Sequence, residues 1–113
     1  MKHTFTVLIL SAIALLAGCT RGAQITVVNR STAELTNVVA AGTGFSQAVG
    51  SIPAGEQRNV SVSPRGESGL QLDFDANGKH YSSTPQGYFE GGSSYKVTAT
   101  VSPDFTVTVD TKL

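Results

Sequence analysis

The chain has 113 residues, a formal net charge of zero, one cysteine and no tryptophan. This length suits one domain, and a single cysteine excludes a disulfide within the chain. No basic excess points to nucleic acid as a partner, and the low share of charged residues, 14%, beside abundant Gly, Ser, Thr and Val favours strands over helices.

The first eighteen residues are predicted to be an export signal. Lys2 precedes an uncharged, largely apolar run over 5–17 that ends in Leu16-Ala17-Gly18-Cys19. The run is shorter than the roughly 20 apolar residues that span a bilayer, and its length suits the apolar region of a signal peptide. Two alternatives use the same residues: a plain secretory signal that happens to contain a cysteine, and a buried helix.

The motif Leu16-Ala17-Gly18-Cys19 resembles the bacterial lipobox. The resemblance implies cleavage between Gly18 and Cys19 and acyl chains such as palmitate on Cys19, which is then neither a redox nor a metal residue. Two or three acyl chains give stable membrane anchoring. Enterobacterial lipoproteins that stay in the inner membrane carry Asp after the cysteine, where this chain has Thr20, so the resemblance implies the outer membrane, facing the periplasm.

These features predict three regions: a signal peptide over 1–18, a lipid-anchored tether over 19–24 and one folded domain over 25–113. The five tether residues after Cys19 reach about 16–18 Å when fully extended. The domain is therefore expected to lie close to the bilayer surface of the bacterial cell envelope.

The folded region begins with segments typical of short strands. Strands are predicted over 24–29, 34–41, 45–49 (a short edge strand) and 56–62, with Arg58, Val60 and Val62 on one face. Ile52-Pro53-Ala54-Gly55 predicts a type I turn, with Pro second and Gly fourth. A polar loop is expected over 63–69.

Asn77-Gly78 predicts a two-residue hairpin, because both central residues of a type I′ turn need positive φ. The register that follows pairs Ala76 with Lys79, Asp75 with His80, Phe74 with Tyr81, and Asp73 with Ser82. Leu70, Leu72, Phe74 and Tyr81 then share the buried face, and Gln71, Asp73, Asp75, His80 and Ser82 share the wet face.

A last hairpin is predicted from two alternating runs, 95–101 and 105–109, joined by the turn Ser102-Pro103-Asp104. One face of this hairpin is aromatic and aliphatic, so it is expected to belong to the core. Taken together, the strands predict an all-β fold, a single antiparallel β-sandwich of about seven short strands after an N-terminal signal helix. A small β-barrel is the alternative.

The stretch from Phe89 to Ala99 resembles the part of fibronectin type III and other immunoglobulin-like domains that carries the tyrosine corner. In those domains a large apolar residue lies six residues before a Tyr, with a glycine-containing turn between. The resemblance implies that Tyr95 takes this role and that its hydroxyl bonds back to the corner backbone. The usual Pro of the turn is absent here.

Two segments carry part of a chemical motif. Asp73, Asp75, Asn77 and Gly78 match the first half of an EF-hand loop, but its twelfth position is Thr84 instead of Glu. Asp75, His80 and Ser82 are the components of a hydrolytic triad, but on an open hairpin face. A solvated hairpin explains both, and we expect a weak Asp75–His80 ion pair at low pH. No catalytic residue, metal site or cofactor is therefore expected.

Partner contacts are expected in the segment 81–89, predicted to be an irregular loop with two adjacent aromatic residues. Adjacent residues on an extended chain point opposite ways, so we expect Phe89 in the core and Tyr88 outside. Exposed Tyr favours protein or sugar contacts. Tyr88 and Gln86 are the candidate contact residues; alternatively, Tyr88 only packs over a sheet edge.

The sequence thus predicts a membrane-anchored envelope lipoprotein, held through lipid on Cys19, that acts as a non-enzymatic binding module. Its partner is expected to be an envelope protein. The alternative is a protective lipoprotein that confers toxin immunity, neutralises an inhibitor or excludes phage.

Overall fold

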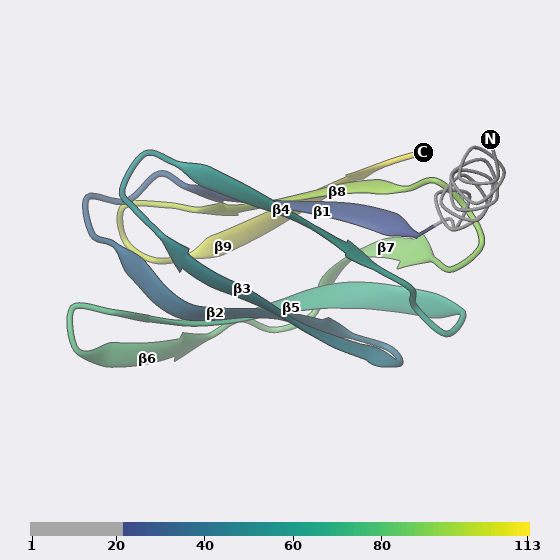
Figure 1. The fold of residues 1–113 in the computed structure, drawn as a ribbon, viewed down its shortest axis with the longest axis horizontal. Helices are drawn as coiled ribbons and strands as arrows, with labels where there is room; N and C mark the ends of the chain where they lie inside the picture. Colours follow the sequence, from purple (N-terminus) through teal and green to yellow (C-terminus); the bar gives the residue numbers. More distant parts are fainter. Residues whose placement is uncertain (1–21) are drawn as a thin grey trace, which may run out of the picture.

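The structure, a computed structural model, describes residues 22–113; the predicted signal peptide, Gly18 and Cys19 lie outside the described residues. The described chain folds as two β-sheets packed face to face, the predicted β-sandwich, and does not close into a barrel (Figure 1). No helix in this part of the chain is long and apolar enough to cross a membrane.

Nine strands are present over residues 22–113, where the sequence predicts about seven. They are β1 (Ala23–Asn29), β2 (Leu35–Gly42), β3 (Phe45–Ile52), β4 (Gln57–Val62), β5 (Glu67–Ala76), β6 (Lys79–Ser82), β7 (Gln86–Glu90), β8 (Lys96–Val101) and β9 (Val107–Lys112). The first strand begins at Ala23, inside the range predicted for the tether.

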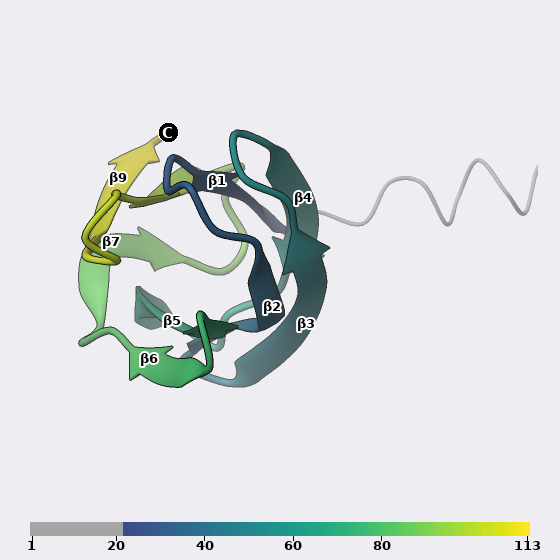
Figure 2. The same cartoon turned by 90° about the vertical axis from the view of Figure 1, so that its left-hand side faces the viewer.

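One sheet has the order β4-β1-β8-β9, and the other has the order β3-β2-β5-β6 with β7 also paired to β5. Strands β6, β7 and β9 lie together on one flank of the sandwich, and β3 and β4 lie on the other (Figure 2). The strands of the described chain pair antiparallel, as predicted, except that β1 runs parallel to β8. A parallel neighbour needs a long crossover, and here the chain from β2 to β7, which forms the second sheet and β4, provides it.

The core lies between the two sheets and follows the alternation of the strands. Every second residue of β1, β5 and β8 is buried, and Phe74 and Phe89 are the largest fully buried side chains. Full burial of one such apolar side chain contributes about 1.5–3 kcal/mol. The predicted inward face of Leu70, Leu72 and Phe74 is confirmed, while Tyr81 is half-buried because β6 is an edge strand.

The Asn77-Gly78 hairpin forms in the predicted register, with Asp75 opposite His80 and Phe74 opposite Tyr81. The φ angles of Asn77 and Gly78 are 50° and 76°. Positive φ at both positions is the type I′ geometry that matches the twist of the flanking strands.

Two turns differ from their predictions. The proline turn lies one residue later, because Glu56 N donates to Pro53 O at 3.1 Å and Gly55 has a φ of 80°. Positive φ at the third residue is the type II geometry. The polar loop predicted over 63–69 is shorter, since β5 already begins at Glu67.

The turn before β9 is also wider than predicted. Val101 pairs with Val107, so 102–106 connect the strands, and Phe105 has a φ of 65°. Phe105 N donates to Ser102 O at 2.8 Å, and Ser102 N donates to Thr106 O at 2.9 Å. This is a tight turn followed by one left-handed residue, a common hairpin loop. Strand β9 is an edge strand, and its Val107 and Val109 are only half-buried.

A buried asparagine joins the loops at the end of the sandwich where β1 finishes. Asn29 is fully buried, and its amide nitrogen donates to Ala33 O at 2.8 Å and to Ile52 O at 3.0 Å. Its Oδ1 accepts from Ser31 N at 3.0 Å and from Ser31 Oγ at 2.7 Å. Both donor and both acceptor positions of the side chain are therefore used.

Replacing Asn29 with Ala should lower the free energy of unfolding by about 2–4 kcal/mol, because the substitution removes the hydrogen bonds of the amide and leaves the Ile52 carbonyl and the Ser31 N–H without this buried partner. Urea denaturation followed by circular dichroism measures this change. Substitution of the exposed Thr32 by Ala, in the same turn, is the control and should give a protein that unfolds like the unchanged one. Equal midpoints for the two variants would show that the Asn29 side chain contributes little.

Candidate functional site

Tyr88 and Phe89 point to opposite sides of β7, as predicted. Phe89 is fully buried, whereas Tyr88 is 46% exposed. The Tyr88 hydroxyl donates to Glu67 Oε1 at 3.1 Å, and its ring meets the Tyr95 ring edge-on, with 6.5 Å between centroids. Tyr88 is thus an exposed aromatic residue that is held in one orientation by β5 and by the segment before β8.

The surroundings of Tyr88 favour its neutral form. Desolvation, and after it the hydrogen bond to Glu67 and the charges of Glu67 and Glu90, raise the pKa of Tyr88 to about 12. Each of these effects disfavours a phenolate next to carboxylates. Tyr88 therefore presents a neutral hydroxyl and an aromatic face to the solvent.

Tyr95 does not take the tyrosine-corner role within residues 22–113. Its hydroxyl makes no hydrogen bond to the described part of the chain, and its half-buried ring packs on the core and against Tyr88. The backbone of Tyr95 has a different task, since its carbonyl accepts a hydrogen bond from Gln24 N at 2.9 Å. This bond ties the start of β1 to the start of β8.

Gln86 has other neighbours than Tyr88, although both belong to β7. Its Nε2 donates to Val107 O on the outer edge of β9 at 2.9 Å. Between Gln86 and Tyr88 the left-handed Gly87, with a φ of 77°, interrupts the alternation of the strand. The two candidate contact residues therefore lie in different environments. Gln86 links the two sheets, and Tyr88 faces solvent.

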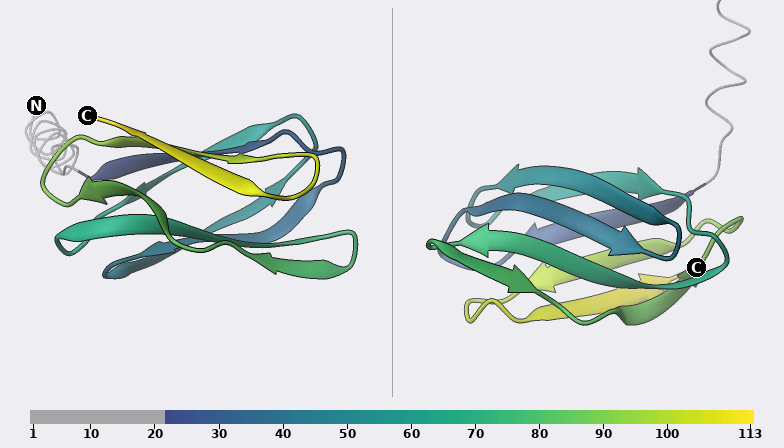
Figure 3. Two further views of the ribbon diagram at one scale, coloured as in Figure 1. Left: turned by 180° about the vertical axis from the view of Figure 1, so that it is seen from behind. Right: turned by 90° about the horizontal axis from the view of Figure 1, so that it is seen from below.

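Gln86 borders a cavity of about 340 Å³ between the edge strands β6 and β9, which we call the β6–β9 slot. Its apolar side consists of Phe74, Tyr81, Phe105 and Val107, and its polar side of Ser82, Ser83, Thr84, Gln86 and Thr106. The slot exists because β5 changes its partner: its first residues pair with β7 and its last with β6. Seen from behind, β9 and β6 lie on the near side, in different sheets (Figure 3).

Three aromatic rings form the apolar wall of the β6–β9 slot. The centroids of Tyr81 and Phe105 are 4.9 Å apart, and the Tyr81 ring stacks on Phe74 at 5.2 Å. The left-handed conformation of Phe105 costs about 1–2 kcal/mol compared with a glycine. Aromatic pairs contribute about 0.5–1.5 kcal/mol each beyond burial, so packing against Tyr81 and Phe74 can offset this cost.

The polar rim of the β6–β9 slot is only partly engaged in hydrogen bonds. Ser83 Oγ accepts from Leu72 N at 2.9 Å, and Thr106 Oγ1 donates to Asp104 Oδ1 at 2.8 Å. Among residues 22–113, nothing bonds to the exposed Thr84 hydroxyl or to the Gln86 Oε1. The rim can therefore offer donors and acceptors to a ligand, and the Tyr81 phenol is the one ionisable side chain that the described residues contribute to the slot.

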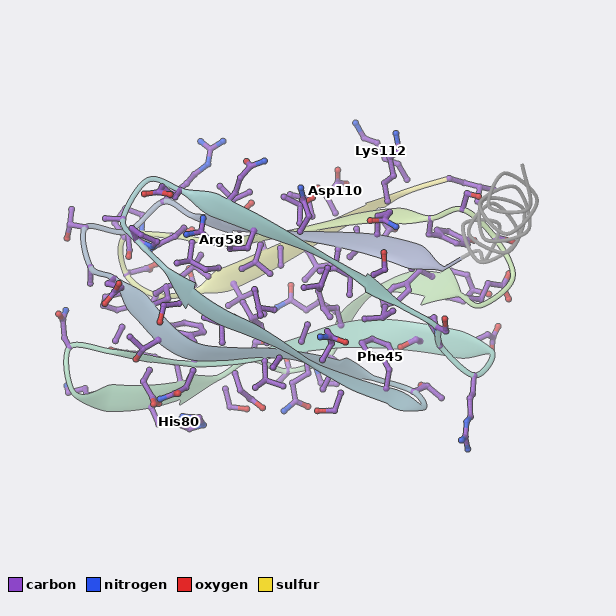
Figure 4. The ribbon with its side chains drawn as sticks, in the orientation of Figure 1. Phe45, Arg58, His80, Asp110 and Lys112 are labelled. Atoms are coloured by element: carbon purple, nitrogen blue, oxygen red, sulfur yellow. The ribbon has the colours of Figure 1, made fainter. Side chains whose placement is uncertain are left out.

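The polar face of the Asn77-Gly78 hairpin also has the predicted composition. His80 Nδ1 lies 2.7 Å from Asp75 Oδ1, and Asn37 Nδ2 donates to Asp75 Oδ2 at 3.0 Å. These two hydrogen bonds, that of Asn37 first, hold the pKa of Asp75 below its usual value. The His80 side chain projects outward from the sheet and is 65% exposed (Figure 4).

Ser82 lies on the same face but is not directed at His80. Its Oγ donates to Asp73 Oδ1 at 2.5 Å and accepts from Gln71 Nε2 at 3.2 Å. The arrangement therefore does not place a nucleophile against a base. The described residues hold no group of three or more His, Cys, Asp or Glu side chains placed to bind one metal ion.

Comparison with known proteins gives a likeness in fold. No protein-family model matches the chain, and no curated protein matches it in sequence. A solved structure similar to it is an NMR structure of a protein from Eubacterium rectale, with a TM-score of 0.54 and 17% identity. The likeness covers 80% of this chain and 87% of that one, and at this identity it concerns the fold alone.

Spectrophotometric titration should find one tyrosine that ionises with a pKa of about 12. This ionisation should be absent from Tyr88→Phe. Glu67→Gln should lower this pKa toward the ordinary tyrosine value, because it removes the negative charge that disfavours the phenolate. Tyr81→Phe is the matched control and should leave the late ionisation in place. Ionisation of Tyr88 in the ordinary range, while circular dichroism still reports a folded sandwich, would contradict the described contacts.

Proposed function

We propose that this chain is the precursor of a bacterial envelope lipoprotein whose sandwich is a non-enzymatic binding module held at the membrane surface. The observation that carries the proposal is the motif Leu16-Ala17-Gly18-Cys19 followed almost at once by folded structure. Lipid on Cys19 supplies the anchor, and the sandwich supplies the surface that meets a partner.

The short distance from Cys19 to the fold supports a membrane-apposed domain. Strand β1 begins at Ala23, four residues after the cysteine. Four residues span about 14 Å at full extension. A domain on such a short tether stays close to the bilayer. Its partner must therefore be present at the same membrane surface.

The strand directions support one orientation of the sandwich relative to the proposed anchor. Gln24 lies beside Lys96, which lies beside Lys112, so β1 begins where β8 begins and where β9 ends (Figure 1). With the anchor at this end, the opposite end points away from the lipid. That outer end carries the β1–β2 connection, the Asn77-Gly78 hairpin and the turn with Phe105, which are the parts best placed to meet a partner.

The side-chain chemistry of the described residues supports a binding role. The Asp75–His80 pair is solvent-facing, and Ser82 bonds to Asp73 instead of His80. The β6–β9 slot, by contrast, combines aromatic walls with polar groups, the composition typical of recognition sites.

Mass spectrometry of the full chain expressed in a Gram-negative host tests the anchor. We expect a membrane-bound product that begins at Cys19 and carries diacylglycerol and a third acyl chain. Cys19→Ser should abolish the lipid and move the protein out of the detergent phase on phase separation, because the diacylglycerol attaches to this thiol and the third acyl chain is added to the amino group of the same residue only afterwards. Thr20→Ser is the control and should keep the lipid. Recovery of an unmodified chain that still begins at Met1, from the cytosol, would refute the proposal.

A further inference from the structure

We propose that the β6–β9 slot binds one ring of a neutral glycan, with the sugar placed against Tyr81 and Phe105. The inference rests on the binding role proposed above and names the class of ligand. Four observations carry it: the aromatic walls, the strained Phe105, the uncharged polar rim and the place of the slot in the fold.

The walls of the slot have the shape that a sugar ring needs. The rings of Tyr81 and Phe105 meet at 38° with centroids 4.9 Å apart, and both residues are half-buried and line the slot. The C–H groups on one face of a pyranose pack against such aromatic surfaces. A cavity of about 340 Å³ is at the lower end of the range of small-molecule sites, about 300–1,000 Å³.

Phe105 occupies a turn position that requires a left-handed residue and that suits glycine better than phenylalanine. Glycine would close the turn between Ser102 and Thr106 without strain, whereas Phe105 adopts a φ of 65°. Strained residues of this kind concentrate at binding sites. The strain positions the Phe105 ring beside Tyr81 at the wall of the slot, where it can serve a ligand as well as the core.

The rim selects against charged and against purely apolar ligands. Within residues 22–113, no Lys, Arg, Asp, Glu or His lines the slot, so an ionic ligand would lose its hydration without gaining a counter-charge from these residues. An apolar peptide side chain would cover the Thr84 hydroxyl and the Gln86 Oε1 without bonding to them, which is costly. The hydroxyls of a neutral sugar both donate and accept, and they can satisfy these groups.

The slot is accessible to a polymer from the envelope. Val101 pairs with Asn29 on one side and with Val107 on the other, so Phe105 lies at the end of β1 opposite to Ala23. With lipid on Cys19, this end faces away from the bilayer. A glycan chain could therefore run past the flank formed by β6 and β9 without meeting the membrane.

Titration of the full chain in detergent micelles tests the inference, with calorimetry and saturation-transfer NMR as readouts. The probes are the tetramer of β-1,4-linked N-acetylglucosamine and maltotetraose. We expect saturable binding of at least one probe with a Kd of about 1 mM or tighter, and transfer from the Tyr81 and Phe105 protons. Phe105→Asn should weaken binding at least about tenfold, and asparagine tolerates the left-handed conformation.

Two further variants test the inference even if Phe105→Asn harms folding. Thr84→Val removes one exposed hydroxyl without removing any bond within residues 22–113, and it should weaken binding several-fold in a folded protein. Thr108→Val, at an exposed threonine of β9 outside the slot, is the matched control and should bind the sugar unchanged. Equal affinities for Thr84→Val, Phe105→Asn and the unchanged protein would place any sugar elsewhere and overturn the inference.

Binding of neither tetramer would also overturn it, as would saturable binding of the apolar dipeptide N-acetyl-Leu-Phe-amide in the slot without binding of either sugar. These outcomes are separate from a failure of the anchor. Cys19→Ser in the same micelles should bind sugar like the unchanged chain, so lost lipidation and lost sugar binding are distinguishable results.

Discussion

The sandwich depends on one buried amide. Asn29 ends β1, and its side chain bonds at once to the connection that leads into β2 and to Ile52 at the end of β3. The backbone of Asn29 adds bonds to Gly55 and Glu56 in the turn that leads to β4. These two connections carry the chain from one sheet to the other and back. A buried amide with every position occupied fixes their spacing, and thereby the way in which the two sheets stack.

The features that could be predicted from the sequence depend on neighbours in the chain. The Asn77-Gly78 register, the inward face of Leu70 to Phe74 and the opposite directions of Tyr88 and Phe89 each follow from a local rule, and the structure confirms them. What could not be predicted depends on partners far along the chain. In the sequence, Asn29 is an ordinary residue at the end of a strand, and its hydrogen bond to Ile52 is known only from the structure. Strand β7 alternates too little to be recognised before its pairing with β5 is known.

The same distinction applies to the candidate site. The exposure of Tyr88 follows from alternation, but its bond to Glu67 and the link from Gln86 to Val107 need the assembled flank. The β6–β9 slot has no signal in the sequence except a bulky Phe105 directly after Ser-Pro-Asp, where a glycine would be easier to accommodate. Alternation places Phe105 on a strand face, and its left-handed conformation becomes evident only once Val101 is seen to pair with Val107.

The flank of the sandwich where β6, β7 and β9 lie is closed by β7 at one end and open at the other. A β-carbon on Gly87 would lie 3.0 Å from Val109 Cγ1 and 3.1 Å from Thr111 Cγ2, so glycine allows β7 to lie close against β9. Toward the outer end β6 replaces β7 as the partner of β5, and no strand of the described chain covers the space beside β9. The closed half holds Phe89 in the core, and the open half leaves room for the slot.

The parallel pairing of β1 with β8 has a mechanical consequence. A pull exerted through the amino-terminal end of β1, against a hold at the far end of the domain, acts along the strand. The ladders from β1 to β4 and to β8 would then be loaded in shear, and many hydrogen bonds would have to break together instead of one after another. The strand nearest the proposed anchor is thus paired on both sides in the geometry that resists tension.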